Sequence, residues 1–236
     1  MGATCYTALM STNSPQRHRG DDGRSDLLSD ARPPKSDPVF ACLGWLDELS
    51  SAIGLLRAEL RYSSDRPTRE AARPDRETET IDGDLRSQQL VLGRLMSVVA
   101  ASPGAPPPTV TPVTEEDPHR LEEIESALRE NTTIRPEFPV AGDGSRSAAL
   151  ADVARARCRT AERALVAFAR GPSSGHDAAG STGNDGAGKD TAGSATNDGA
   201  ARPAEPALPP RTDLSESVRY INRLSDYLFV VARHLE

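Results

Sequence analysis

The sequence predicts an all-α protein whose helices share a single core. In five segments, apolar residues recur every three to four positions, which is the spacing of one helix face. These segments are 36–61, 81–101, 114–131, 145–170 and 213–236. Two stretches between them, 61–80 and 171–210, are polar and contain few residues that could be buried. We therefore expect one helical domain over residues 1–236, with its apolar content concentrated in the five helices.

Composition and charge exclude several classes of function. Hydrophobic residues make up 36% of the 236-residue chain and aromatic residues 4%, and the net charge is -7. An acidic chain is a poor candidate for non-specific nucleic-acid binding. No apolar run approaches the roughly 20 residues that span a bilayer. We expect a protein that binds neither nucleic acid nor membrane.

The cysteines point to a reducing compartment. Cys5, Cys42 and Cys158 lack the spacing of metal ligands, and Cys42 and Cys158 fall within helical patterns as small core residues. An odd number of cysteines without a signal peptide is typical of a cytoplasmic protein.

Local signals mark where the helices begin. Ser36-Asp37-Pro38 reads as the start of the first helix, with proline in the first turn. Thr212 or Asp213, followed by Glu216, resembles a capping box for the last helix. The stretch 61–80 reads as a flexible connection, and 171–210, rich in Gly, Ala, Ser, Asp and Asn, as a disordered insertion.

An acidic residue lies beside the apolar stripe of the first helix. Asp47 is next to Leu46 and one turn from Leu43 and Ser50. It is either a partly buried carboxylate with a partner or an exposed acid at the edge of the stripe.

A stripe of arginines organises the fourth helical segment. Arg155, Arg159 and Arg163 are four residues apart and therefore share one helix face. Guanidinium groups bind phosphate and carboxylate oxygens in bidentate fashion, so the stripe suits a polyanion. The alternative is a solvated basic face.

Two loops carry further candidates. In Gly20-Asp21-Asp22-Gly23-Arg24-Ser25, the two glycines could turn tightly and present backbone N–H groups to phosphate or carboxylates to a cation, or form a surface turn. Lys35, one of two lysines, follows Pro34. Phe138, in Pro136-Glu137-Phe138-Pro139, either plugs one end of the bundle or acts as a rigid wedge in a pocket.

Together these segments resemble the PduO-type ATP:cob(I)alamin adenosyltransferases. The run Ala154-Arg155 through Cys158-Arg159-Thr160-Ala161-Glu162-Arg163 looks like the hallmark of that family, although Thr160 replaces its second arginine. The run Arg219-Tyr220-Ile221-Asn222-Arg223-Leu224-Ser225-Asp226 is similar to the closing helix of the family. Pro34-Lys35, the Gly44–Gly54 stretch and Gly20-Asp21-Asp22-Gly23 match its N-terminal half in order.

The resemblance implies a five-helix bundle that forms a homotrimer, with each active site between two subunits. It implies transfer of the 5′-deoxyadenosyl group of ATP to cob(I)alamin, with magnesium bound near the nucleotide. A corrinoid reductase and an adenosylcobalamin-dependent mutase are the partners that such a reaction suggests. The alternative is a non-catalytic relative that binds corrinoid or nucleotide, because the insertion 8–19 interrupts the nucleotide loop.

The resemblance also implies roles for individual residues. Six of them would form a nucleotide loop within residues 1–37, namely Thr7, Gly20, Gly23, Arg24, Ser25 and Lys35. Four would hold ATP and the magnesium environment from the last two helices, namely Arg159, Glu162, Arg163 and Asn222. Asp47 would pair with Arg159, Phe138 would lie beneath the corrin, and Arg155 would contact cobalamin. No residue is assigned as a direct metal ligand.

Overall fold

The computed structural model describes residues 20–29, 31–64, 76–102, 111–134, 140–141, 144–171 and 213–236. Thr7, Phe138 and all of the predicted insertion 171–210 except Gly171 lie outside these residues. The described helices are α2 (Pro38–Ser64), α3 (Arg76–Ala101), α4 (Glu116–Glu130), α5 (Arg146–Arg170) and α6 (Ser215–His234). Apart from one isolated bridge between Arg24 and Pro34, the regular structure of the described residues is helical. The predicted all-α five-helix bundle is therefore confirmed.

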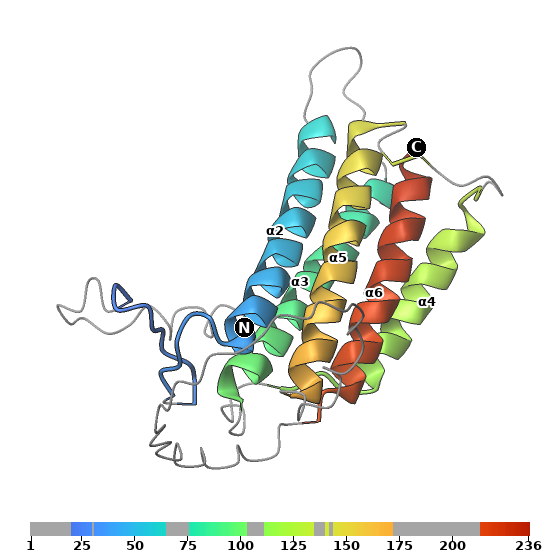
Figure 1. The fold of residues 1–236 in the computed structure, drawn as a ribbon. Helices are drawn as coiled ribbons and strands as arrows, with labels where there is room; N and C mark the ends of the chain where they lie inside the picture. The colour runs from blue at the N-terminus through green and yellow to red at the C-terminus, as the bar shows by residue number, and fades with distance from the viewer. Residues whose placement is uncertain are drawn as a thin grey trace, which may run out of the picture.

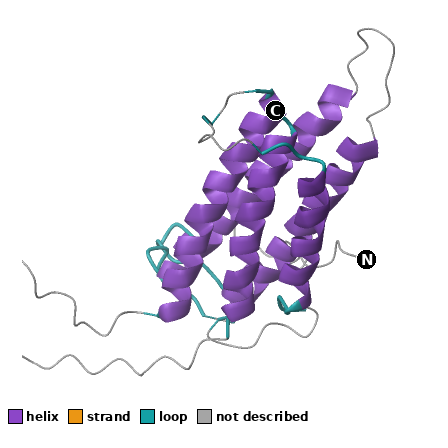
Figure 2. Ribbon diagram, turned by 90° about the vertical axis from the view of Figure 1, so that its right-hand side faces the viewer, coloured by secondary structure: helices purple, strands orange, loops and turns teal. Residues whose placement is uncertain are grey.

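Helix α5 occupies the middle of the bundle. It packs against α2 on one side and α6 on the other, while α3 packs on α2 and α4 packs on α6 (Figures 1 and 2). Two ion pairs, Arg157–Glu48 and Arg146–Glu59, show that α2 and α5 run antiparallel. The arginine stripe thus lies on a helix whose neighbours hold it from both sides.

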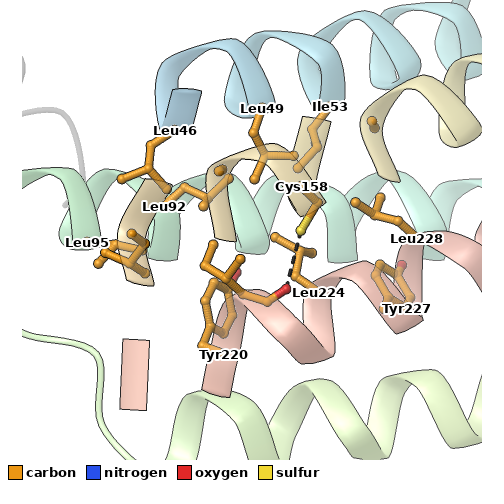
Figure 3. Close-up of a cluster of buried hydrophobic side chains, with 14 of the residues drawn as sticks. Leu46, Leu49, Ile53, Leu92, Leu95, Cys158, Tyr220, Leu224, Tyr227 and Leu228 are labelled. Carbon is orange, nitrogen blue, oxygen red and sulfur yellow. Dashed lines mark hydrogen bonds between the residues drawn. The ribbon is translucent and has the colours of Figure 1, made fainter. Parts of the chain in front are cut away.

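The core is formed by the apolar stripes of all five helices. Leucines of α2 and α3 meet Cys158 of α5 and the aromatic and leucine side chains of α6 (Figure 3). Tyr220 and Tyr227 are the largest fully buried side chains. Tyr220 donates a hydrogen bond to Gln88 Oε1 at 2.9 Å, so its hydroxyl is satisfied inside the bundle. Full burial of each such large side chain stabilises the fold by roughly 1.5–3 kcal/mol.

The predicted helix starts at Pro38 and Ser145 are confirmed. The backbone N–H of Val39 donates to Asp37 Oδ1 at 2.9 Å, directly before the first turn of α2. Ser145 caps α5 by accepting a hydrogen bond from the N–H of Ala148 at 3.0 Å. The Ser36-Asp37-Pro38 signal predicted the first start, whereas the cap by Ser145 was not predicted, although capping joins residues within one turn.

Part of the predicted flexible connection at 61–80 is helical. Helix α3 begins at Arg76, five residues before the first core residue of that helix, Ile81. Glu77 and Glu79 lie in its first turn, where acidic side chains interact favourably with the helix dipole. The apolar pattern missed this turn because its side chains face solvent.

The predicted capping box of the last helix is wrong in its arrangement. Helix α6 begins at Ser215, and the N-cap position is taken by Leu214, whose side chain makes no cap hydrogen bond. Asp213 Oδ1 instead accepts from the N–H of Ser215 at 2.9 Å. This hydrogen bond lowers the pKa of the Asp213 carboxyl below its usual range.

Helix α2 is more apolar than the sequence pattern suggested. Its Pro38–Tyr62 stretch is the one candidate for a membrane span in the described residues, by length and composition alone. A core helix passes the same test. Seven residues of α2 lie in the bundle core, namely Val39, Cys42, Leu46, Leu49, Ile53, Leu56 and Leu60. Their helical spacing is that of a helix buried along one face.

Candidate functional site

Residues 20–35 form a small hairpin that brings together most of the predicted nucleotide loop. The ammonium group of Lys35 donates to the carbonyl oxygen of Gly20 at 2.8 Å. The N–H of Lys35 donates to the carbonyl oxygen of Gly23 at 2.7 Å, and the N–H of Ser25 donates to that of Pro33 at 3.2 Å. Backbone and side-chain hydrogen bonds thus hold Gly20 and Lys35 close together, although they are 15 positions apart in the sequence.

The two glycines of the hairpin are constrained by its geometry to different degrees. Gly23 has a φ of +74°, a conformation that L side chains rarely adopt. A Cβ atom on Gly20 would lie 3.0 Å from Lys35 Nζ. A side chain at position 20 would therefore require the flexible end of Lys35 to shift by a few tenths of an ångström.

The acidic residues of the hairpin stabilise it internally. Arg32 donates to both carboxylate oxygens of Asp22, at 2.8 and 3.0 Å. The backbone N–H of Arg24 donates to the same carboxylate, and this bond together with Arg32 lowers the pKa of Asp22. The Arg24 guanidinium donates to the carbonyl oxygen of Arg32 at 2.8 Å. Asp22 therefore acts as an acceptor within the hairpin, and the predicted surface turn is an ordered structure.

The second group of predicted residues lies on neighbouring faces of α5 and α6. Asn222 Nδ2 donates to Glu162 Oε1 at 3.2 Å, which joins the two helices. Arg159 and Arg163 are exposed, and Arg163 donates to the hydroxyl of Thr160 at 3.2 Å. The replacement of the second hallmark arginine by Thr160 thus places a hydroxyl beside Arg163. These residues present two guanidinium groups, a carboxylate and an amide on one surface.

Arg155 contacts a buried ion pair between Asp152 and Arg233, which the sequence did not predict. Its Nε lies 3.3 Å from Asp152 Oδ1, and Arg233 Nη2 of α6 donates to Asp152 Oδ2 at 2.8 Å. Asp152 and Arg233 have side chains only 6% and 4% exposed. The two residues are 81 positions apart. No local pattern could pair them, although a buried acid on an otherwise apolar face is itself a signal for a partner.

The predicted pair between Asp47 and Arg159 does not form within one chain. In the described part of the chain, no hydrogen bond or ion pair joins the side chains of Asp47 and Arg159. Asp47 is exposed and lies about 200° around α2 from the buried Leu49. Arg159 lies about 200° around α5 from Arg157, the residue that faces α2. Within one chain, Asp47 is therefore an exposed acid at the edge of the apolar stripe.

A neighbouring arginine takes the place expected for Arg159. Arg157 Nη1 lies 2.5 Å from Glu48 Oε2, and the Arg157 guanidinium carbon lies 5.9 Å from the centre of the Trp45 ring. The ion pair between α2 and α5 thus joins Glu48, one position after Asp47, to Arg157, two positions before Arg159.

Cys158 is a core residue. Its thiol donates to the carbonyl oxygen of Ile221 at 3.3 Å (Figure 3). Burial, reinforced by the negative charge of Glu162, raises the pKa of the thiol well above its usual range. A buried thiol of this kind is not a nucleophile at neutral pH.

The two groups of candidate residues lie on different sides of one chain. The hairpin is anchored to α3, since the N–H of Leu28 donates to the carbonyl oxygen of Ala100 at 3.0 Å. In Figure 1 it extends beyond the lower end of α2, on the opposite side of the bundle from α6 and α4.

Comparisons with known proteins give a family for this chain. The sequence model of the cobalamin adenosyltransferase family matches residues 16–180. No curated protein sequence matches the chain significantly.

Several solved structures share the fold. A Phe-to-His variant of the PduO-type ATP:corrinoid adenosyltransferase from Lactobacillus reuteri, complexed with cobalamin and ATP, has a TM-score of 0.64 at 20% identity. The similarity covers 94% of this chain and 90% of that one. An Arg-to-Lys variant of the Lactobacillus reuteri enzyme, complexed with ATP, has a TM-score of 0.58 at 21% identity, covering 91% and 89% of the two chains. The matched family model spans the hairpin, helices α2 to α5 and the arginine stripe, and the chain belongs to the cobalamin adenosyltransferase family.

Proposed function

We propose that this protein transfers the 5′-deoxyadenosyl group of ATP to cob(I)alamin and releases triphosphate. The observation that carries the proposal is the hairpin closed by Lys35 over Gly20 and Gly23, in a chain of this family. The hairpin offers an ammonium group for phosphate, and the α5–α6 surface offers the guanidinium groups of Arg159 and Arg163.

The reaction needs positioning and charge more than a protein nucleophile. Co(I) attacks the ribose C5′, the bond from C5′ to the triphosphate oxygen breaks, and the electron pair leaves with triphosphate. The protein must align C5′ with cobalt and stabilise the leaving group. Lys35, Arg159 and Arg163 supply positive charge for the second task. A reductase is the class of partner that must supply Co(I).

Magnesium fits this site as an ion carried by the nucleotide. Within the described residues, no group of three His, Cys, Asp or Glu side chains could hold a metal by itself. Mg²⁺ commonly uses substrate phosphates, water and one or two carboxylates. Glu162 is the carboxylate of the α5–α6 surface that could complete such a set.

We propose further that the active site forms between subunits of a homotrimer. The hairpin and the α5–α6 surface lie on different sides of one chain, and Asp47 and Arg159 are exposed opposite charges without a mutual contact. Only 33% of the most apolar window of α2 is buried, so much of that helix remains available to another copy. The number of subunits comes from the family resemblance.

Light scattering at micromolar concentration will give the mass of three chains. The outer face of α2 carries Leu55 and Tyr62, whose exposed fractions of 53% and 59% favour burial against a second copy. A variant with Leu55→Glu and Tyr62→Glu should dissociate and lose activity. A wild-type monomer would contradict the inter-subunit site.

Phe138→Ala will slow adenosyl transfer strongly while ATP affinity and the thermal midpoint change little. This outcome is expected if Phe138 is a wedge beneath the corrin that displaces the lower cobalt ligand. If Phe138 were a core residue, its removal would instead lower stability by about 3–5 kcal/mol. Rates and melting curves on the same variant separate the two roles.

A turnover assay tests the proposed function directly. The protein is incubated with ATP, Mg²⁺ and chemically reduced cob(I)alamin, and the absorption spectrum is followed for conversion to adenosylcobalamin. Triphosphate should appear in equal amount. ATP binding by calorimetry without conversion would support the non-catalytic relative instead.

A further inference from the structure

Asn222 sits in a chain of four polar residues that joins three helices. Glu162 of α5 accepts from Asn222 Nδ2 at 3.2 Å, and Asn222 Oδ1 accepts from Arg223 Nη1 at 3.0 Å. Arg223 in turn donates through Nε to Glu122 Oε1 of α4 at 2.6 Å. Glu162 and Asn222 belong to the candidate ATP site, whereas no role in that site has yet been given to Arg223 and Glu122.

The two hydrogen bonds of Asn222 determine which way its amide points. An asparagine amide can rotate by half a turn and exchange its donor and acceptor ends. In the rotated state, Oδ1 would face the carboxylate of Glu162 and the NH₂ group would face the guanidinium donor of Arg223. Both contacts would be repulsive, so Arg223 and Glu162 together select one orientation.

Arg223 needs a second anchor to perform this task. Consecutive residues on a helix point in directions about 100° apart, so Arg223 reaches Asn222 sideways along the surface. Glu122 holds the guanidinium in that position through a charge-assisted bond. This bond lowers the pKa of the Glu122 carboxyl and raises the pKa of Arg223, so both stay charged. Asp226 Oδ2, 3.7 Å from Nη1, is a further acidic neighbour.

We infer that Arg223 and Glu122 are positioning residues that orient the Asn222 amide toward bound ATP. The inference rests on the proposed function, because it takes Asn222 as an ATP contact. Without its Arg223 bond, Asn222 would be oriented by Glu162 alone, so its preference for one amide orientation would weaken and ATP binding would be weaker because the amide has to be reordered.

Arg219 provides a matched control on the same helix. Its Nη2 lies 3.6 Å from the same oxygen of Glu122, and its side chain is 37% exposed, compared with 36% for Arg223. In the described part of the chain, Arg219 makes no hydrogen bond to Asn222. Arg219 and Arg223 are therefore similarly exposed partners of Glu122, but only Arg223 donates hydrogen bonds to Glu122, at 2.6 Å, and to Asn222, at 3.0 Å.

The experiment compares ATP affinity by calorimetry, and the KM for ATP, in Arg223→Gln and Arg219→Gln proteins. Arg223→Gln should weaken ATP binding by about tenfold, the effect expected for one charge-assisted hydrogen bond. Arg219→Gln should stay within about twofold of wild type, because exposed ion pairs contribute little. Both variants should keep the wild-type melting midpoint. Equal ATP affinities of the two variants would overturn the inference.

Two further variants separate the remaining explanations. Arg223→Lys keeps the charge but not the planar fork, so ATP binding should remain weak, and full recovery would mean that Arg223 acts only through its charge.

Asn222→Ala should weaken ATP binding at least as much as Arg223→Gln. If Asn222→Ala binds ATP normally, the proposed ATP site itself is wrong. If Asn222→Ala weakens binding and Arg223→Gln does not, only the positioning role is wrong.

Discussion

Arg159→Ala and Asp47→Asn will each reduce the rate of adenosyl transfer by about 100-fold or more, the scale for losing a preorganised charged contact. Both side chains are exposed and lie on faces that cannot meet within one chain. We expect them to pair across the subunit interface, where Asp47 orients the Arg159 guanidinium at the junction of ATP and corrin. The rates are measured with saturating ATP and varied cob(I)alamin.

Mixed trimers of the two inactive variants test this pairing directly. When the chains are produced together, some interfaces combine the intact Asp47 of the Arg159→Ala chain with the intact Arg159 of the Asp47→Asn chain. Activity should return to a fraction of wild type in these mixtures. If both residues acted within one chain, mixing would restore nothing.

Arg157→Ala is the matched control for Arg159→Ala. Arg157 lies two positions earlier on α5 and pairs with Glu48 inside its own chain. Its loss should leave turnover close to wild type, because an exposed pair of this kind contributes about 0–1 kcal/mol to stability. A double-mutant cycle for Asp47 and Arg159 should show a coupling of about 1 kcal/mol or more.

Asp152→Asn will lower the free energy of unfolding by about 3–5 kcal/mol, the usual effect of breaking a buried ion pair. The substitution keeps the size of the side chain but leaves the guanidinium of Arg233, 4% exposed, without its buried counter-charge. The second acidic neighbour of Arg233, Glu236 at 3.1 Å, has a side chain 33% exposed and compensates only in part. Denaturant unfolding at fixed protein concentration measures the effect.

A double replacement separates loss of the ion pair from loss of packing. Asp152→Leu combined with Arg233→Met removes both charges while keeping apolar volume, and should recover most of the lost stability. Arg146→Gln removes an exposed arginine of the same helix, α5, which pairs with Glu59 of α2, and should change stability by less than about 1 kcal/mol. Equal losses in Asp152→Asn and Arg146→Gln would contradict a special role for burial.

The sequence by itself determined the number and type of the helices and most of their ends. Helical spacing of apolar residues and the Ser36-Asp37-Pro38 start join residues within one or two turns, so they can be read along the chain. The same locality explains the missed turn at Arg76–Thr80, whose charged and polar side chains carry no apolar pattern, and α2 likewise continues to Ser64, past its predicted end near Arg61. The hallmark residues around Arg159 and Asn222 identified the family for a similar reason, because they are contiguous.

Only the tertiary structure decided which charged residues meet. Arg157 rather than Arg159 faces α2, since the rotation of α5 about its own axis is set by packing of Cys158 and its neighbours in the core. The Asp152–Arg233 pair and the Glu122–Arg223–Asn222 chain join residues about 80 to 100 positions apart. Such pairings depend on how whole helices dock, and the energy of docking comes from the shared core and not from the local sequence around each charge.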